Sequence, residues 1–282
     1  MNMESVVVGI ITKLLTRTPI FIHDESEHIH SNLYQPFAFS DVFLREVNRD
    51  VDKTILHIWP MEQVVILGMM DRRLPYCDEG IKAIRTHGYR AVVRNVGGLA
   101  VVADTGVLNF SFILPKRTDS ISIQEAYLLM TQFIQAIFVE ENVRIEHYVI
   151  KDSYCPGDFD LSISGKKFAG IAQRRFKDGI AISIYLSVCG NQMKRGELIK
   201  TFYQYGKKNE KTKFSFPQVN PSSMANLCDL LHKNLTVEEV KHRILDTLQK
   251  MNSQLLTLQL DMQMKEEYKL FYDKMIERNR KI

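Results

Sequence analysis

Short apolar runs bounded by turn residues recur along the chain, and this pattern predicts β-strands. The clearest strand is 108–114, whose alternate residues form one strongly apolar face made of Leu108, Phe110, Phe112 and Leu114. Three consecutive runs, 159–163, 167–176 and 180–188, are separated by short turns that contain glycine, and they predict a three-strand meander. Further strands are predicted at 20–24, 54–59, 64–67, 91–93 and 99–102.

Apolar residues at helical spacing predict helices elsewhere in the chain. A short helix is predicted from Ser40, a second from Asp78 to Gly88, and a longer one after the capping-box sequence Ser122-Ile-Gln-Glu125. From Thr236 a second capping box begins a helical pattern that runs nearly to the end of the chain. Its apolar stripe consists of Val240, Ile244, Leu248, Met251, Leu255 and Leu258. The highly charged segment 265–282 is predicted to be a solvated helix.

The order of these elements indicates the fold class. Strands and helices are interspersed, and hairpins occur late in the chain, which favours an α+β fold over a doubly wound parallel sheet. With 282 residues, the chain can bury a large core without disulfides or metals.

Charge and cysteine content exclude several classes of function. A net charge of +4 with scattered lysines and arginines is too weak for a nucleic-acid binder, although it would suit an acidic protein partner. The four cysteines have no C-x-x-C spacing, so we expect no zinc or other metal. The chain has no secretory leader pattern and no apolar run of membrane length. We therefore expect a cytoplasmic protein with reduced thiols and no membrane association.

The first candidate for chemistry is the sequence Arg94-Asn-Val-Gly-Gly98, which lies between two predicted strands. Adjacent glycines let the backbone approach a ligand closely, although a plain tight turn is the more common explanation of a lone glycine pair. The segment is a stronger candidate for a ligand site because Asp104 and Asn109 follow one strand later.

The second candidate is Cys155, which sits between Tyr154 and Pro156-Gly157 and is therefore predicted to lie in a loop. Cysteine is more often a small core residue, so this position departs from the ordinary pattern. Twelve residues later, Lys167 begins a strand that a meander can bring back beside the loop. An ammonium beside a thiol lowers the pKa of that thiol and favours the nucleophilic thiolate. A solvated strand lysine remains the alternative for Lys167. Cys77, Cys189 and Cys228 are predicted to be structural.

Together these segments resemble the biotin/lipoate protein ligase and octanoyltransferase superfamily. The matching pieces are Val65-Ile-Leu-Gly68, Arg94 to Gly98, Asp104 to Ser111, and Gly165-Lys-Lys-Phe-Ala-Gly170. The segment Ser153-Tyr-Cys-Pro-Gly-Asp-Phe-Asp160 is most similar to the octanoyl-[glycine cleavage system H protein]:protein N-octanoyltransferases.

The resemblance implies a central mixed β-sheet with flanking helices over 40–225, with 1–39 as an extension packed on it and 226–282 as a C-terminal helical segment. It implies that Cys155 is the acyl-thioester nucleophile and that Lys167 meets the acyl carbonyl and relays a proton. It also implies an acyl tunnel near the Arg-Gly-Gly turn. The substrate-binding residues expected from it are Arg94, Asn95, Gly97, Gly98, Asp104, Asn109 and Gly170.

The reaction implied is transfer of an octanoyl or lipoyl group from a lysine of the glycine cleavage system H protein to lysines of lipoyl domains in 2-oxoacid dehydrogenase E2 subunits, with no cofactor. Lipoate ligases usually carry a third glycine and a His-Asp pair, where this chain has Leu99 and Ala103-Asp104. This departure makes ATP-dependent ligation less favoured. Octanoyl transfer from acyl carrier protein, ATP-dependent ligation and a non-catalytic carrier-binding protein stay open as alternatives.

Overall fold

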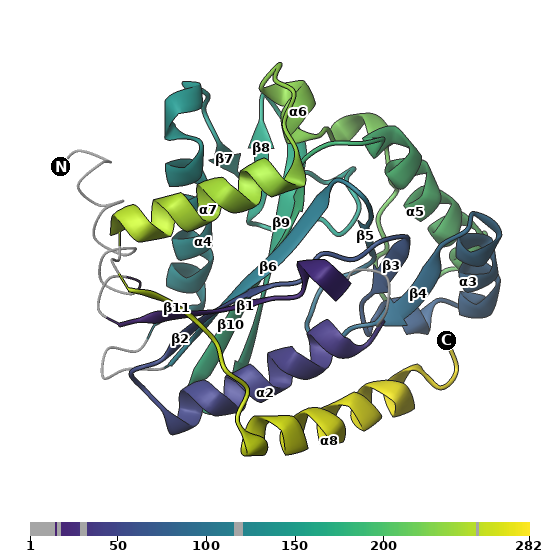
Figure 1. The fold of residues 1–282 in the computed structure, drawn as a ribbon. Helices are drawn as coiled ribbons and strands as arrows, with labels where there is room; N and C mark the ends of the chain where they lie inside the picture. The colour runs from purple at the N-terminus through teal and green to yellow at the C-terminus, as the bar shows by residue number, and fades with distance from the viewer. Residues whose placement is uncertain (1–14, 16–17, 29–32, 116–120, 252–253) are drawn as a thin grey trace.

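The computed structural model describes residues 15, 18–28, 33–115, 121–251 and 254–282 (Figure 1). Most of the predicted extension before residue 18 lies outside the described residues. The strands are β1 Ile20–Asp24, β2 Thr54–Ile58, β3 Val64–Leu67, β4 Arg90–Val93, β5 Val101–Ala103, β6 Val107–Leu114, β7 Glu146–His147, β8 Asp160–Ile163, β9 Lys166–Phe176, β10 Gly179–Ser187 and β11 Leu255–Thr257. The α-helices are α2 Gln35–Arg49, α3 Cys77–Thr86, α4 Ile123–Ile137, α5 Gln192–Lys207, α6 Leu227–Leu230, α7 Val237–Met251 and α8 Met262–Asn279. Short 3-10 turns cover Ser26–His28, Asp71–Arg73, Val139–Glu141 and Pro221–Ser223.

The strands form two sheets, and the larger one is mixed. Its order is β11-β1-β2-β6-β10-β9-β8-β7, in which β1 pairs in parallel with β11 and β2 while the other pairings are antiparallel. The smaller sheet has the order β4-β3-β5. Helices pack on these sheets (Figure 1), so the predicted α+β fold with a central mixed sheet is confirmed.

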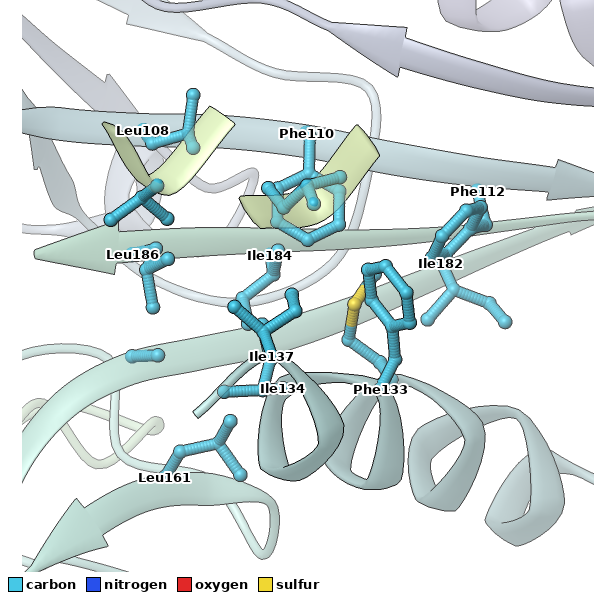
Figure 2. Close-up of a cluster of buried hydrophobic side chains, with 14 of the residues drawn as sticks. Leu108, Phe110, Phe112, Phe133, Ile134, Ile137, Leu161, Ile182, Ile184 and Leu186 are labelled. Carbon is cyan, nitrogen blue, oxygen red and sulfur yellow. The ribbon is translucent and has the colours of Figure 1, made fainter. Parts of the chain in front are cut away.

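Strand β6 shows how alternation along the sequence divides the two faces of the large sheet. Leu108, Phe110, Phe112 and Leu114 belong to the main core. Figure 2 shows the first three beside Phe133 of α4 and isoleucines of β10. On the opposite face, Ile113 packs against α2 and α8. The same opposite face carries Asn109 and Ser111, which are buried polar residues. One strand therefore supplies both the hydrophobic core and the polar lining of a site on the other side.

The helix boundaries depend on local capping groups. Helix α4 begins where predicted, because Ser122 Oγ accepts a hydrogen bond from the Glu125 amide and Glu125 accepts one from the Ser122 amide. Helix α2 begins at Gln35, five residues before the predicted start at Ser40, with Pro36 in its first turn. Proline is favoured there because its missing N–H would have no intrahelical partner.

The prediction for the end of the chain is partly wrong. Helix α7 ends at Met251, and Leu255 lies on strand β11 rather than on a continuous helix. The cause is tertiary pairing, since β11 adds to the edge of the sheet in parallel with β1. Helix α8 is not simply solvated, because Phe271 and Met275 are buried and the helix lies along α2 (Figure 1). Helix α5 was not predicted. Among the described residues, no helix is both long and apolar enough to span a membrane.

Candidate active site

A cavity of about 230 Å³ lies on the polar side of β6, between the two sheets. Strands β6, β9 and β10 of the large sheet contribute Asn109, Gly170 and Tyr185 to its wall. Strands β3 and β5 of the small sheet contribute Ile66 and Val101. Seven of the residues predicted from the sequence line it together, namely Arg94, Gly97, Gly98, Asn109, Cys155, Lys167 and Gly170.

Cys155 lies at this cavity in a strained loop. Its backbone φ of 47° is left-handed, a conformation that non-glycine residues hold only when their surroundings enforce it. The neighbouring Phe159 ring is stacked between Tyr127 and His147, with centroids 4.6 and 5.2 Å away, which pins the end of the loop. The Cys155 sulfur accepts a hydrogen bond from the Leu99 amide at 3.1 Å.

The turn that presents this amide is held by Arg94. Its buried guanidinium donates from Nε to the Gly97 carbonyl at 3.1 Å and from Nη2 to the Leu99 carbonyl at 2.9 Å. Nη2 also lies 3.9 Å from Cys155 Sγ. Gly98 has a φ of 103°, and a Cβ there would come within 2.3 Å of Arg94 Nη2. The second glycine is therefore required by backbone conformation and by space.

The turn also depends on Gly68 at the end of β3. A Cβ at Gly68 would lie 1.8 Å from the Gly98 carbonyl oxygen, so the two backbones touch. The Gly68 amide donates to the Asp71 carboxylate at 2.7 Å, and the other carboxylate oxygen accepts from the Tyr203 hydroxyl at 2.8 Å. Burial raises the pKa of Asp71 to about 6, and these hydrogen bonds offset part of that effect.

Lys167 reaches the site because of an irregularity in the sheet. The β8–β9 register shifts between Leu161 and Ser162, so Phe168 is an extra residue on β9. Residues three apart on a regular strand face opposite sides, whereas a bulge between them restores a common side. Lys167 and Gly170 therefore both line the cavity.

The Lys167 ammonium is fully buried and has several partners. Its Nζ lies 2.8 Å from Asp160 Oδ1 and donates to the carbonyls of Tyr154 and Cys155, both at 2.9 Å. It also lies 3.2 Å from Ser153 Oγ. Burial raises the pKa of Asp160, and the adjacent lysine opposes that rise. The lysine thus holds the backbone of the cysteine loop, while the described group that hydrogen-bonds the sulfur most closely is the Leu99 amide.

Asn109 contributes a free hydrogen-bond donor to the cavity. It is paired in register with Tyr185 of β10, and Tyr185 with Gly170 of β9, so the three form a row across the sheet. The Asn109 Nδ2 atom is buried and has no hydrogen-bond partner. A buried donor of this kind costs free energy unless a ligand or water satisfies it.

Two residues predicted to bind substrate lie outside the cavity lining. Asn95 Nδ2 donates to the Phe37 carbonyl at 2.9 Å and to Asp41 at 2.7 Å, which ties the turn to α2. Asp104 accepts a hydrogen bond from the Tyr89 hydroxyl at 2.8 Å and lies 3.5 Å from Arg195 Nε. Both contact protein groups that stabilise the surroundings of the site.

Three contributors to the site have little or no signal in the sequence. The Leu99 amide could not be found from residue types, because a backbone N–H has no sequence signature. Asp160 stood in the motif around Cys155, and the hairpin from β8 to β9 was the available signal that it would face Lys167. Tyr127 lines the cavity from α4, far from both motifs.

The remaining cysteines lie where burial disfavours the thiolate. Burial raises the pKa of Cys77 to about 11, and it also raises the pKa of Cys189 and of Cys228. A thiol in this state is a poor nucleophile.

Within the described residues, the donor atoms of His23, Glu25 and His57 lie close enough to one another to approach a cation. The group is on β1, β2 and the loop after β1, away from the cavity lining. His57 Nε2 hydrogen-bonds Glu25 Oε1, and its buried Nδ1 has no partner. The observed contact in this group is therefore a buried histidine–glutamate pair.

Known structures share this fold. Lipoate-protein ligase A bound with ATP has a TM-score of 0.70 at 16% sequence identity, covering 92% of this chain and 95% of that one. The Ta0514 protein from T. acidophilum, a putative lipoate protein ligase with bound lipoic acid, has a TM-score of 0.68 at 16% identity, covering 92% and 96%. At this identity the likeness shows the fold alone.

The sequence comparisons are more specific. The model of the lipoyl protein ligase A/B catalytic domain matches residues 32–249. The octanoyl-[GcvH]:protein N-octanoyltransferases of Oceanobacillus iheyensis and Staphylococcus aureus are each 43% identical, covering 86% and 88% of this chain and 87% and 89% of theirs. The lipoyl-[GcvH]:protein N-lipoyltransferase of Listeria monocytogenes is 42% identical over 88% of this chain and 89% of its own length. The chain therefore belongs to the lipoyl protein ligase A/B catalytic-domain family and, within it, to the acyltransferases of the octanoyl-[GcvH]:protein N-octanoyltransferase type.

Proposed function

We propose that this enzyme moves an octanoyl or lipoyl group from a lysine of the glycine cleavage system H protein to a lysine of E2 lipoyl domains, through a thioester on Cys155. Relatives named for an H-protein donor support the choice of donor. The observation that carries the proposal is that Cys155 lines the cavity while its Sγ lies 3.1 Å from a backbone amide. The reaction belongs in the cytoplasm, where thiols stay reduced.

In the first half-reaction, the Cys155 thiolate attacks the carbonyl carbon of the acyl-lysine amide. A C–S bond forms, the C–N bond breaks, and the departing lysine amine takes the proton that the thiol released. The Leu99 amide stabilises the negative charge on sulfur before the attack. In the second half-reaction, the acceptor lysine amine attacks the thioester carbonyl. A C–N bond forms, the C–S bond breaks, and the proton that the amine loses returns to the sulfur to regenerate the thiol.

Two donors of hydrogen bonds are available for the substrate carbonyl. Asn109 Nδ2 has no partner and is buried at the cavity. Lys167 also lines the cavity, although its Nζ already hydrogen-bonds the cysteine loop and lies 2.8 Å from Asp160. Binding of the acyl carbonyl by Lys167 therefore requires exchange of one of these contacts. Either donor would stabilise negative charge on the carbonyl oxygen in the transition state.

The proposal is tested by intact-mass spectrometry after the purified protein is mixed with octanoylated H protein. We expect a mass increase of one octanoyl group on the enzyme, and its loss when an unmodified lipoyl domain is added. The Cys155→Ala variant should acquire no octanoyl group. Peptide mapping should place the group on Cys155 rather than on Cys77, Cys189 or Cys228.

Parallel reactions separate the alternatives. Octanoyl-acyl carrier protein offered as the only donor tests thioester transfer, and free octanoate with ATP tests ligation. Acylation of the lipoyl domain only in one of those reactions would contradict the proposed donor. Binding of the carrier without any acyl transfer in all three reactions would contradict enzymatic function.

A further inference from the structure

The C-terminal end of helix α8 contacts the backbone at the start of the 94–99 turn, which presents the Leu99 amide to Cys155. Strand β4 is an edge strand of the small sheet, and β3 is its one partner among the described strands. In this parallel pairing Arg94 donates its amide to the Leu67 carbonyl, so the amide and carbonyl of Val93 point away from β3. Val93 is buried, and its two backbone groups require other partners.

Asn279 supplies both partners with one side chain. Its Oδ1 accepts from the Val93 amide at 2.6 Å, and its Nδ2 donates to the Val93 carbonyl at 3.2 Å. Asn279 is only 3% exposed, and Nδ2 also donates to the Met275 carbonyl at 2.9 Å within the helix. The side-chain amide thus completes the open edge of β4 as a neighbouring strand would.

A second contact joins the same two segments. Arg278 Nη1 lies 3.3 Å from the carbonyl oxygen of Arg94. The end of α8 therefore contacts the Val93 amide, the Val93 carbonyl and the Arg94 carbonyl. These groups come immediately before the part of the turn that the Arg94 guanidinium holds. From Arg94 the connection continues through its guanidinium to the Leu99 carbonyl, and from the Leu99 amide to Cys155 Sγ.

We propose that Asn279 is a positioning residue, which fixes the start of the 94–99 turn so that the Leu99 amide is held against the sulfur of Cys155. The inference rests on the proposed role of Cys155 as nucleophile. It gives the C-terminal helix a function in the active site, although no residue of α8 lines the cavity. Loss of the contact lets the turn move and weakens stabilisation of the thiolate.

The test compares three variants of the full chain. Asn279→Ala removes both bonds to Val93. Asn279→Asp keeps an acceptor for the Val93 amide but places a second oxygen against the Val93 carbonyl, so protonation of the new carboxyl at low pH should restore the donor. Phe271→Leu is the matched control, because Phe271 packs α8 against α2 without contacting the turn.

Two rates are measured for each variant, alkylation of Cys155 by iodoacetamide followed by peptide mapping, and octanoyl transfer. We expect Asn279→Ala to lower the alkylation rate and kcat by roughly tenfold or more, with KM for the donor nearly unchanged. Asn279→Asp should be slower still at neutral pH and should recover relative to Asn279→Ala as the pH is lowered. Phe271→Leu should keep near wild-type rates at temperatures where all variants are folded.

A wild-type alkylation rate in Asn279→Ala would overturn the inference, and so would an equal loss in Phe271→Leu at the same thermal stability. If Asn279→Ala does not fold, the comparison of Asn279→Asp at low and neutral pH decides. The alkylation rate needs no acyl donor. It therefore tests the position of the turn even if transfer from H protein fails in the wild-type protein.

Discussion

The amide nitrogen of Leu99 lies 3.1 Å from the sulfur of Cys155, 56 residues away in the chain. This contact joins the two sequence motifs, the Arg-Gly-Gly turn and the cysteine loop, into one site. The hydrogen bond comes from the backbone, so its geometry depends on the glycines and on Arg94 rather than on the side chain at position 99.

Gly97 and Gly98 should differ sharply in how well they tolerate substitution by alanine. Gly98→Ala places a Cβ 2.3 Å from Arg94 Nη2 in a left-handed backbone, so we expect a loss of about 1–2 kcal/mol of stability or more and a large loss of transfer. Gly97→Ala is the control, because a Cβ there meets nothing within 4 Å. Thermal unfolding and octanoyl transfer check both variants. Equal stability of the two would contradict the steric explanation.

Lys167 should contribute both to the stability of the protein and to the rate of octanoyl transfer, and two variants should separate these effects. Lys167→Met leaves the buried Asp160 without its ion pair and should cost about 3–5 kcal/mol of stability. Adding Asp160→Asn removes the unpaired carboxylate and should recover part of that stability, while octanoyl transfer stays strongly reduced. Denaturant unfolding and transfer assays measure the two effects. Near-normal transfer in the double variant would mean that Lys167 acts only on the fold.

Substitution of Gly170 should affect transfer of the acyl group more than the stability of the fold. A Cβ at this position lies 3.5 Å from Lys167 Cε and from Tyr185 Cδ1, which is ordinary contact, so Gly170→Ala should fold with wild-type stability. The added methyl occupies the cavity wall, and we expect slower octanoyl transfer with a smaller effect on a shorter acyl group. Transfer rates with octanoyl and butanoyl donors check this. Equal losses for both lengths would place Gly170 away from the acyl chain.

The stability of the protein should depend on pH through Asp71. Its folded-state pKa of about 6 lies above the ordinary 3.8, so the folded protein binds a proton that the unfolded chain releases. The contribution of this group is therefore fully present below about pH 4 and is lost as the pH rises through 6. Its size is on the order of 3 kcal/mol. Denaturant unfolding between pH 4 and 7 should show this slope in the wild-type protein relative to Asp71→Asn. Parallel pH curves would contradict it.

Much of the fold was predictable because its strands are short, apolar and bounded by clear turns. Alternation in β6 predicted its apolar face, and the capping box at Ser122 predicted where α4 begins. Periodicity failed at Leu255, where the spacing of an apolar helix stripe continues into a strand that only pairing with β1 can explain. Helix α5 was missed, although eight of its residues are buried.

The site was predictable where residue type carries the chemistry and not where backbone geometry does. Cys155, Lys167 and Gly98 line the cavity, and the sequence indicated all three. The bulge at Phe168 that turns Lys167 inward depends on register between two strands, which local sequence does not encode. Asn95 and Asp104 share the motifs of cavity residues, yet their side chains are satisfied by neighbouring protein groups instead.

The pairing of β1 with β11 has a consequence for synthesis. Ile20 of β1 is in register with Leu255 of β11, so this edge of the sheet stays open on the ribosome until some 235 further residues have emerged. The backbone groups of Val93 gain their partner only when Asn279 is made, 186 residues after Val93. A nascent chain can therefore form most of its core during translation. The residue just before the 94–99 turn, however, gains its contacts with Asn279 only after helix α8 has left the exit tunnel.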